Sequence, residues 1–317
     1  MKKLLVILGP TAIGKTDLAL KLAKKLGGEL VAADSRQVYK GLDIGTGKYS
    51  PKDYFKKFPR KWLINNVWIH GYDLVEPNKR FTVADFINFF WKISKKIWAD
   101  GKLPILVGNT GFYITAALTG FETLGIPPHS KLRKRLEKLS SNELYAELQK
   151  IDKDKVKALS PTEAKNPQRL IRAIEVAKFK KSHSKIVSTY PYINREEVNV
   201  LKIGLTCLRE ILYQRIDRRV DERINMGMIE EVKKLLAMGV SSQRLKALGL
   251  EYRYLTELVL GEIAKAEAIS KLKFAIHDAA RRQLTWFRRE KDIIWFDIID
   301  RNFYQKVENK LEKWYSK

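Results

Sequence analysis

The feature that most constrains this chain is a glycine-rich loop near its amino terminus, Gly9-Pro10-Thr11-Ala12-Ile13-Gly14-Lys15-Thr16. The loop follows the apolar run Leu4 to Leu8 and opens into the amphipathic stretch Asp17 to Leu26, which is the strand, loop and helix order of a phosphate-binding loop. Backbone N–H groups of such a loop bind phosphate oxygens, and we expect Lys15 to reach the terminal phosphate. We expect the Thr16 hydroxyl to bind Mg²⁺. An ordinary strand-to-helix turn is the alternative.

The apolar runs beyond the loop predict an α/β fold. Short apolar segments at Glu29 to Ala33, Ile69 to Tyr72 and Leu103 to Val107 alternate with amphipathic stretches, and Thr82 is positioned to cap a helix that ends at Gly101. Strands that alternate with helices form a parallel sheet. The expected fold class is therefore α/β, with a P-loop NTPase-like parallel sheet flanked by helices.

The middle of the chain predicts a separate helical domain. Highly charged, helix-like stretches occupy Ser130 to Lys178 with no strand between them, and the sheet pattern resumes at Val200 to Leu205. We therefore place an all-helical insertion domain at 120–195. It interrupts a catalytic core domain made of 1–119 and 196–317.

Charge and cysteine content restrict the partners and the compartment. Lysine and arginine number 61 against 36 acidic residues, a formal net charge of +25, which suits a polyanion such as nucleic acid. A generally lysine-rich protein with solvated charges is the alternative. The single cysteine, Cys207, excludes an internal disulfide and a cysteine-based zinc site, and no apolar run is long enough to span a membrane. We expect a soluble, cytoplasmic protein.

Two further polar segments each follow a predicted strand. Asp34-Ser35-Arg36-Gln37 follows the second strand, and Asn109-Thr110-Gly111 follows the strand that ends at Val107. Both segments therefore lie at the carboxyl edge of the sheet, where α/β proteins bind ligands. Asp34 can act as a magnesium ligand or a general base, and Thr110 can bind a phosphate or a nucleobase. A turn cap at Asp34 and a plain turn at Thr110 are the alternatives. The glycine-rich run Gly41 to Lys48 predicts only a flexible loop.

Together these segments resemble the tRNA dimethylallyltransferase family, whose members attach a five-carbon prenyl group to a tRNA adenine. The resemblance covers nearly the whole chain and is closest to the bacterial type. It is carried by the loop Gly9 to Thr16, Asp34-Ser-x-Gln-Val-Tyr, Asp43-Ile-Gly-Thr, Asn166-Pro-Gln-Arg-Leu-Ile-Arg172, Arg209-x-x-Leu-Tyr-x-Arg-Ile, Ala247-Leu-Gly and Arg282-Gln-x-Thr-Trp-Phe-Arg288.

The resemblance implies that the loop binds dimethylallyl diphosphate rather than ATP, with Mg²⁺, and that pyrophosphate leaves. It implies three catalytic residues: Lys15, Thr110 and the general base Asp34, which acts on the amine of the adenosine 3′ to the anticodon. That base must flip out of its stack to reach the sheet edge. The insertion domain is expected to contact the anticodon stem-loop, and the chain to be a monomer. The residues expected to bind tRNA are Asp34, Ser35, Arg36, Gln37, Thr110, Arg133, Gln168, Arg169, Leu170, Ile171 and Arg172.

Small departures and other protein classes complete the expectations. Asn109 and Asn166 stand where many family members have glycine and aspartate, and Asn109 puts the fine substrate preference in doubt. Arg209 or Arg215 can add a pyrophosphate clamp, with solvated arginines as the alternative.

A P-loop nucleoside or nucleotide kinase shares the loop, and an RNA-binding ATPase shares the loop and the charge. Neither class explains all the matched segments.

Overall fold

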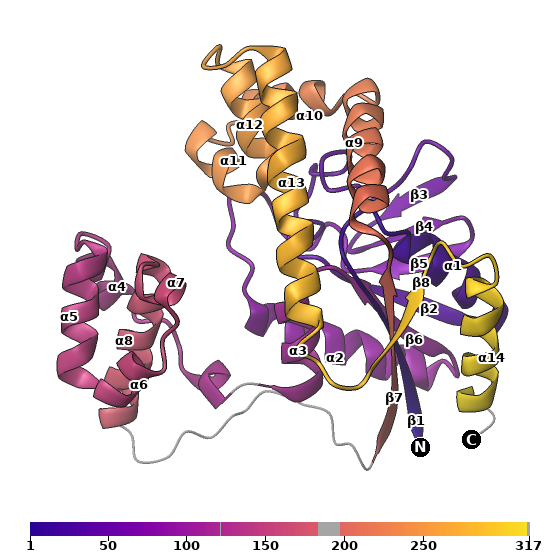
Figure 1. Cartoon of the computed structure of the whole chain (residues 1–317), viewed down its shortest axis with the longest axis horizontal. Coiled ribbons are helices and arrows are strands. Elements are labelled where there is room, and N and C mark those ends of the chain that lie inside the picture. Colours follow the sequence, from indigo (N-terminus) through magenta and orange to yellow (C-terminus); the bar gives the residue numbers. More distant parts are fainter. Residues whose placement is uncertain (121, 183–196, 316–317) are drawn as a thin grey trace. The chain divides into compact units, whose positions relative to one another are not determined.

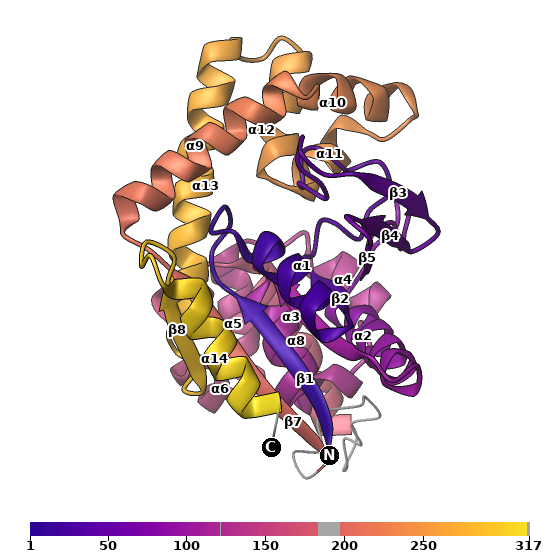
Figure 2. The same ribbon diagram turned by 90° about the vertical axis from the view of Figure 1, so that its right-hand side faces the viewer.

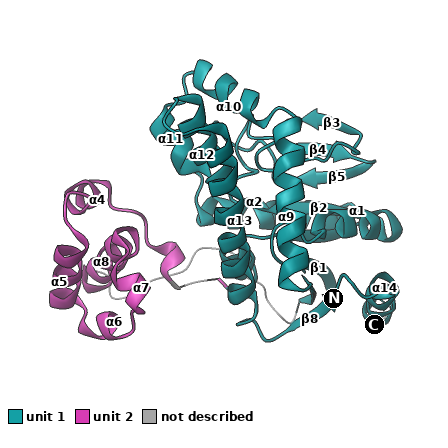
Figure 3. Ribbon diagram, turned by 45° about the horizontal axis from the view of Figure 1, so that its top comes forward, with its two compact units in different colours: residues 1–119, 192–317 teal, residues 120–191 magenta. Residues whose placement is uncertain are grey.

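The computed structural model describes residues 1–120, 122–182 and 197–315. The chain forms two compact units, shown in different colours in Figure 3: Met1–Thr119 with Tyr192–Lys317, and Gly120–Pro191. The end of the insertion expected at residue 195 lies outside the described residues. Each unit has its own hydrophobic core. No helix in these described ranges is both long and apolar enough to cross a membrane.

The larger unit is built on one sheet, which in the described residues has eight strands in the order β3-β4-β5-β2-β6-β1-β7-β8 (Figure 1). Neighbouring strands from β5 to β8 are parallel, which confirms the expected α/β class. The lysine-rich strands β3 and β4 were not expected, and they add an antiparallel edge. The strands are β1 (Lys2–Leu8), β2 (Gly28–Ala33), β3 (Phe55–Phe58), β4 (Lys61–Ile64), β5 (Val67–His70), β6 (Leu103–Gly108), β7 (Val198–Thr206) and β8 (Ile293–Asp297).

Helices flank this sheet and extend beyond it. The Thr82 side chain caps α2 as expected, in a reciprocal capping box with Asp85. Figures 1 and 2 show that α9 to α12 lie beyond the carboxyl ends of β1 and β7, the edge where ligands bind in α/β folds. The helices are α1 (Lys15–Leu26), α2 (Val83–Ala99), α3 (Gly111–Thr119), α9 (Arg209–Asn225), α10 (Met228–Ala237), α11 (Ser242–Leu248), α12 (Leu250–Val259), α13 (Lys265–Phe287) and α14 (Phe303–Tyr315).

The smaller unit is helical throughout its described residues. Its core joins apolar side chains of α4, α5, α6 and α8, including Leu136, Leu148 and Leu170. Two serine–glutamate capping boxes start α5 and α7. The elements are a 3₁₀ turn (Glu122–Gly125), α4 (Ser130–Leu136), α5 (Ser141–Ile151), α6 (Lys153–Lys157), α7 (Pro161–Ala164) and α8 (Pro167–Ser182).

Candidate active site

The loop between β1 and α1 has the backbone geometry that its glycines allow. Gly9 has a φ of 146°, and a Cβ there would lie 2.7 Å from the carbonyl oxygen of Leu205, so the loop packs tightly against β7. Gly14 has a φ of 97° and precedes α1 as its N-cap. Residues other than glycine rarely adopt these φ angles. The loop therefore presents the start of α1 to the edge of the sheet, as a phosphate site requires.

Lys15 is the buried cation of this loop. Its ammonium group donates a hydrogen bond of 2.6 Å to the carbonyl oxygen of Pro10. Burial and the nearby Arg219 guanidinium lower the pKa of Lys15 to about 7, while Asp34 acts in the opposite direction. The site thus holds two basic side chains close together with little solvent, which favours a bound anion.

The ends of β2 and β6 bring the other two expected segments together. Gly108 closes β6 against β2, because a Cβ there would lie 2.1 Å from the carbonyl oxygen of Ala33. As a result the backbone N–H of Ser35 donates to the Thr110 hydroxyl at 3.1 Å, and the N–H of Thr110 donates to Ala33 at 3.2 Å. Asp34 and Thr110 therefore share one edge, as expected from the strand order.

Asp34 combines a turn cap with a free carboxylate oxygen. Its Oδ1 accepts hydrogen bonds from the backbone N–H groups of Arg36 at 2.8 Å and Gln37 at 3.3 Å. Its Oδ2 accepts none from the residues that the structure describes. The turn cap at Oδ1 is thus compatible with the expected role of Asp34 as a general base, since that role can use Oδ2.

Two adjoining cavities meet at Asp34. The inner cavity, of about 50 Å³, is lined by the loop residues Lys15 and Thr16, by Arg219, and by the apolar side chains Ala32, Ile69 and Val107. The outer cavity, of about 380 Å³, has more cations than carboxylates in its lining: Arg36, Arg223, Lys246, Arg253 and Arg282 against Asp34 and Glu251. Both are lined by Thr11, Asp34, Thr46 and Asn109. The cavity beside the phosphate loop and the wider, basic cavity therefore share a wall that includes Asp34.

The run Gly41 to Lys48 was expected to be a flexible loop, but its segment 42–48 is held in place on the side of α10. The Glu231 carboxylate accepts hydrogen bonds from three successive N–H groups, those of Asp43, Ile44 and Gly45, at 2.7–3.0 Å. The Tyr252 hydroxyl donates to the same carboxylate at 2.7 Å. The flexible-loop expectation is corrected, because these partners come from helices too distant in sequence for a local pattern to reveal them.

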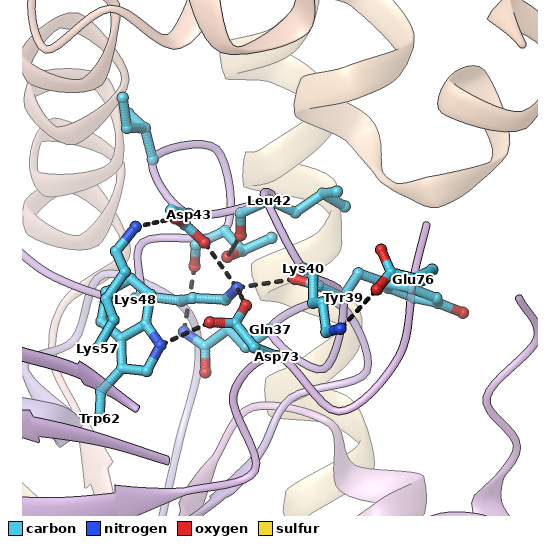
Figure 4. Close-up of polar contacts among 12 residues, drawn as sticks. Gln37, Tyr39, Lys40, Leu42, Asp43, Lys48, Lys57, Trp62, Asp73 and Glu76 are labelled. Atoms are coloured by element: carbon cyan, nitrogen blue, oxygen red, sulfur yellow. Dashed lines mark hydrogen bonds and ion pairs between the residues drawn. The ribbon is translucent and has the colours of Figure 1, made fainter. Parts of the chain in front are cut away.

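Lys48 holds the same segment from the side of the sheet (Figure 4). Its side chain is 1% exposed and donates to the Tyr39 carbonyl oxygen, to Asp43 and to Asp73 at 2.5–2.7 Å. The Gln37 amide donates to the carbonyl oxygens of Thr46 and Gly47, both at 3.2 Å. Because Thr46 lines both cavities, these contacts fix part of the wall around Asp34.

Helix α9 contributes arginines that the sequence reasoning missed. Arg219 lines the inner cavity and approaches the Thr11 hydroxyl at 3.4 Å, and burial beside Arg223 lowers its pKa to about 9. Arg223 donates to the Gly45 carbonyl oxygen at 2.9 Å. Arg215, one of the two arginines expected as a clamp, donates to the carbonyl oxygen of Ala12 at 2.9 Å. The signal was the spacing of Arg215, Arg219 and Arg223, which places all three on one helix face.

The residues of the smaller unit that were expected to bind tRNA fall into two groups. Arg133 forms two hydrogen bonds with the buried carboxylate of Glu175, at 2.6 and 3.1 Å, and Arg172 approaches the same carboxylate at 3.4 Å. Leu170 and Ile171 belong to the core, so their side chains do not face solvent. The exposed members of the segment are Gln168 and Arg169.

The residues at the inner cavity fit a magnesium ion that arrives with phosphate oxygens. Within the described ranges, no three histidine, cysteine, aspartate or glutamate side chains gather as a metal cluster. The Thr16 hydroxyl and the Asp34 carboxylate nevertheless line one cavity with Lys15. Mg²⁺ is often held by one or two protein oxygens together with substrate phosphates. The donor set therefore suits a metal bound by protein and diphosphate jointly.

The fold and these cavities define a P-loop α/β protein in which the cavity at the loop adjoins a second, wider and basic cavity. A family model described as IPP transferase matches residues 37–290. The chain is 37% identical to a tRNA dimethylallyltransferase of Anoxybacillus flavithermus, over 98% of this chain and 95% of that protein. It is 38% identical to tRNA dimethylallyltransferase 1 of Parabacteroides distasonis, over 93% and 92%. A solved tRNA isopentenylpyrophosphate transferase of Bacillus halodurans is 34% identical, with a TM-score of 0.68 over 100% of this chain and 99% of that one. The chain belongs to the IPP transferase family.

Proposed function

We propose that this protein transfers a dimethylallyl group from dimethylallyl diphosphate to the exocyclic amine of the adenosine 3′ to the anticodon in tRNA, and releases pyrophosphate. Family membership supports the reaction class. The observation that carries the proposal is the position of Asp34, which lines both the cavity of the phosphate loop and the wider basic cavity. An acceptor in one cavity and a donor in the other would meet at its free oxygen.

The inner cavity supplies the groups that stabilise the departing diphosphate. Negative charge accumulates on the leaving oxygens as the bond from carbon to oxygen breaks, and Lys15 and Arg219 both line this space. A single preorganised donor of this kind is worth about 3–4 kcal/mol in other enzymes. A magnesium ion held with Thr16 would add further charge stabilisation. The apolar side chains Ile69 and Val107 offer a surface for the prenyl chain.

The outer cavity suits a flipped base. The adenine amine is a weak nucleophile, so we infer that it attacks an allylic carbon that is already losing pyrophosphate. A bond forms between the amine nitrogen and this carbon, the bond from carbon to the diphosphate oxygen breaks, and the amine proton passes to Asp34 Oδ2. Thr110 lines the outer cavity beside Asp34, which supports a role in orienting the base. Asn109 lines both cavities, so we expect its side chain to leave less room between them than a glycine would.

The basic lining of the outer cavity suits the RNA that surrounds this base. Extruding a nucleotide costs a few kcal/mol, and phosphate contacts in the cavity mouth offset this cost. Lys246, Arg253 and Arg282 lie there. The smaller unit offers the exposed Gln168 and Arg169 for the anticodon stem. We propose that the protein acts in the cytoplasm as a monomer.

Transfer of a labelled dimethylallyl group to unmodified tRNA tests the proposal directly. We expect incorporation that depends on dimethylallyl diphosphate and Mg²⁺, and loss of most activity in Thr110→Ala. A parallel measurement of melting temperature separates the alternatives. If ATP with Mg²⁺ stabilises the protein far more than dimethylallyl diphosphate does, and no prenyl group reaches tRNA, a kinase or an RNA-binding ATPase replaces this function.

A further inference from the structure

The hairpin formed by β3 and β4 concentrates positive charge at one edge of the sheet. Residues 52–61 include five cationic side chains and one carboxylate, Asp53. Figure 3 shows β3 as the outermost strand on this side, and no residue of 52–61 lines either cavity. The hairpin is therefore a surface separate from the site. Its cations are Lys52, Lys56, Lys57, Arg60 and Lys61.

Most of this charge is not neutralised within the protein. Lys57 pairs with Asp43 at 2.6 Å. Asp53 accepts hydrogen bonds from the N–H of Ser50 and the amide of Asn65 rather than from a cation. The other four hairpin cations form no ion pair with any residue that the structure describes. They are free to bind an external anion.

On the carboxy-terminal helix α14, in contrast to the hairpin, charged side chains of both signs form ion pairs. Lys306 on that helix pairs with Asp300, and Glu308 and Glu312 pair with Lys25. Cations and carboxylates are mixed there, as on an ordinary solvated surface. The hairpin instead presents a single sign of charge.

Exposed aromatic rings lie among the hairpin cations. Tyr54 is 62% exposed and Phe58 is 41% exposed. The Lys56 ammonium lies 5.9 Å from the centre of the Tyr54 ring, and the Lys61 ammonium lies 3.8 Å from that of Trp68. Cations that bind phosphates, next to rings on which bases or sugars can stack, are the pattern of a nucleic-acid surface.

The base of the hairpin is held by side-chain contacts, and Figure 4 shows those of Lys57 and Trp62. The Lys57 ammonium lies 4.5 Å from the centre of a Trp62 ring, and the Trp62 indole N–H donates to Asp73 at 2.6 Å. Phe55 stacks on Trp62 with ring centres 5.2 Å apart. Because Asp73 also binds Lys48, the hairpin is fixed to the segment that forms the cavity wall. A preordered surface loses less conformational entropy on binding.

We propose that the β3–β4 hairpin is a second RNA-binding surface, which contacts the sugar-phosphate backbone of tRNA outside the two cavities. This inference rests on the proposed function in taking tRNA as the RNA. The competing explanation is protection of an edge strand, since lysines on such a strand prevent pairing with another chain. The two explanations differ in what a negative charge does, because glutamate also protects an edge but repels phosphate.

The test is a charge reversal with a matched control. Lys56→Glu with Arg60→Glu changes the net charge by the same amount as Lys310→Glu with Lys313→Glu on α14, where both lysines are exposed. Binding of unmodified tRNA is measured as a function of salt. For the hairpin variant we expect roughly tenfold weaker binding at about 0.1 M salt and a salt slope smaller by about two, as for two lost phosphate contacts. The α14 variant should remain close to wild type.

Equal losses in both variants would mean that only net charge matters, and no loss in the hairpin variant would leave edge protection as the explanation. Either result overturns the proposal. Lys56→Gln with Arg60→Gln repeats the test without new repulsion, in case the reversal impairs folding, which the melting temperature reports. Prenyl transfer by the wild-type protein is measured in the same preparation. If that transfer fails while the hairpin variant still loses tRNA affinity, the proposed function is wrong and the RNA surface stands.

Discussion

The sequence assigns both Asp34 in the larger unit and Arg133 in the smaller unit to tRNA, and the structure gives them different surroundings. Asp34 uses one carboxylate oxygen to cap a turn, and the residue lines two cavities. Arg133 directs two nitrogens at the buried carboxylate of Glu175 and lines neither cavity. Two residues of matched motifs thus differ in their surroundings. One lies at a cavity, and the other lies in an ion pair between helices of its own unit.

Asp34→Asn is the strongest test of the larger unit. Asparagine keeps an oxygen that can cap the turn but cannot take the amine proton, so kcat should fall by about 10²–10⁴-fold. The Kd for tRNA should change little, because the cap and the cavity remain. Single-turnover prenyl transfer and tRNA binding measure the two effects. Full activity in Asp34→Asn would remove the general base from the mechanism.

Arg133→Ala is the corresponding test of the smaller unit. Removing one partner of a buried ion pair leaves Glu175 with too little compensation, which costs about 3 kcal/mol in other proteins. Hydrogen exchange of α8 amides in the whole chain reports this free energy of local unfolding. Arg135→Ala is the control, because Arg135 is 58% exposed and pairs with Glu147, so its loss should cost below about 1 kcal/mol. If Arg133→Ala leaves the hydrogen-exchange protection of α8 unchanged but weakens tRNA binding, Arg133 serves tRNA binding rather than the stability of the smaller unit.

The pH dependence of ligand binding gives the smallest expected effect. The pKa of Lys15 is about 7, so the ammonium is mostly present below pH 7 and mostly lost above it. Affinity for dimethylallyl diphosphate should therefore fall as pH rises from 7 to 8, by up to about fivefold. A bound anion raises the pKa of Lys15, and the affinity stops falling once the pH exceeds that raised pKa. Calorimetry on wild type and Lys15→Arg checks this.

Lys15→Arg stays cationic over this range, so it isolates the titration of the ligand from that of the lysine. A decline of the same size in both proteins would show that Lys15 does not titrate near neutral pH. A decline in the wild type alone would sharpen the contrast with Arg133 and Arg135 of the smaller unit, which pair with Glu175 and Glu147.

Local patterns were sufficient for much of the fold and for part of the site. The phosphate loop is contiguous, and its strand and helix lie directly on either side, so Lys15 and Thr16 could be assigned from order alone. Asp34 and Thr110 follow from strand ends, because parallel strands deliver their carboxyl ends to one edge. The helix at Thr82 follows from its cap and its apolar spacing.

The rest depended on contacts between distant segments. Lys246 and Arg253 reach the outer cavity because α11 packs on α12 and α12 packs on α13. The sequence around a lysine or arginine on a short helix does not show whether its side chain lines a cavity or faces solvent. The hairpin was missed because its strands are short and rich in lysine, which is depleted in strands. The contact between Glu231 and segment 42–48 depends on tertiary packing that the sequence pattern does not encode.

The position of β1 in the sheet has a consequence for how the protein assembles during synthesis. This strand carries the phosphate loop and lies between β6 and β7, and β7 follows the whole smaller unit in sequence. The first hundred residues to leave the ribosome therefore contain the loop, but they contain neither β6 nor β7, the two strands that support it. The smaller unit has contacts that are local in sequence and can fold early. The two cavities must await the last third of the chain, which supplies Arg219, Arg223 and Arg282. A truncated product would retain the conspicuous motif without a working site.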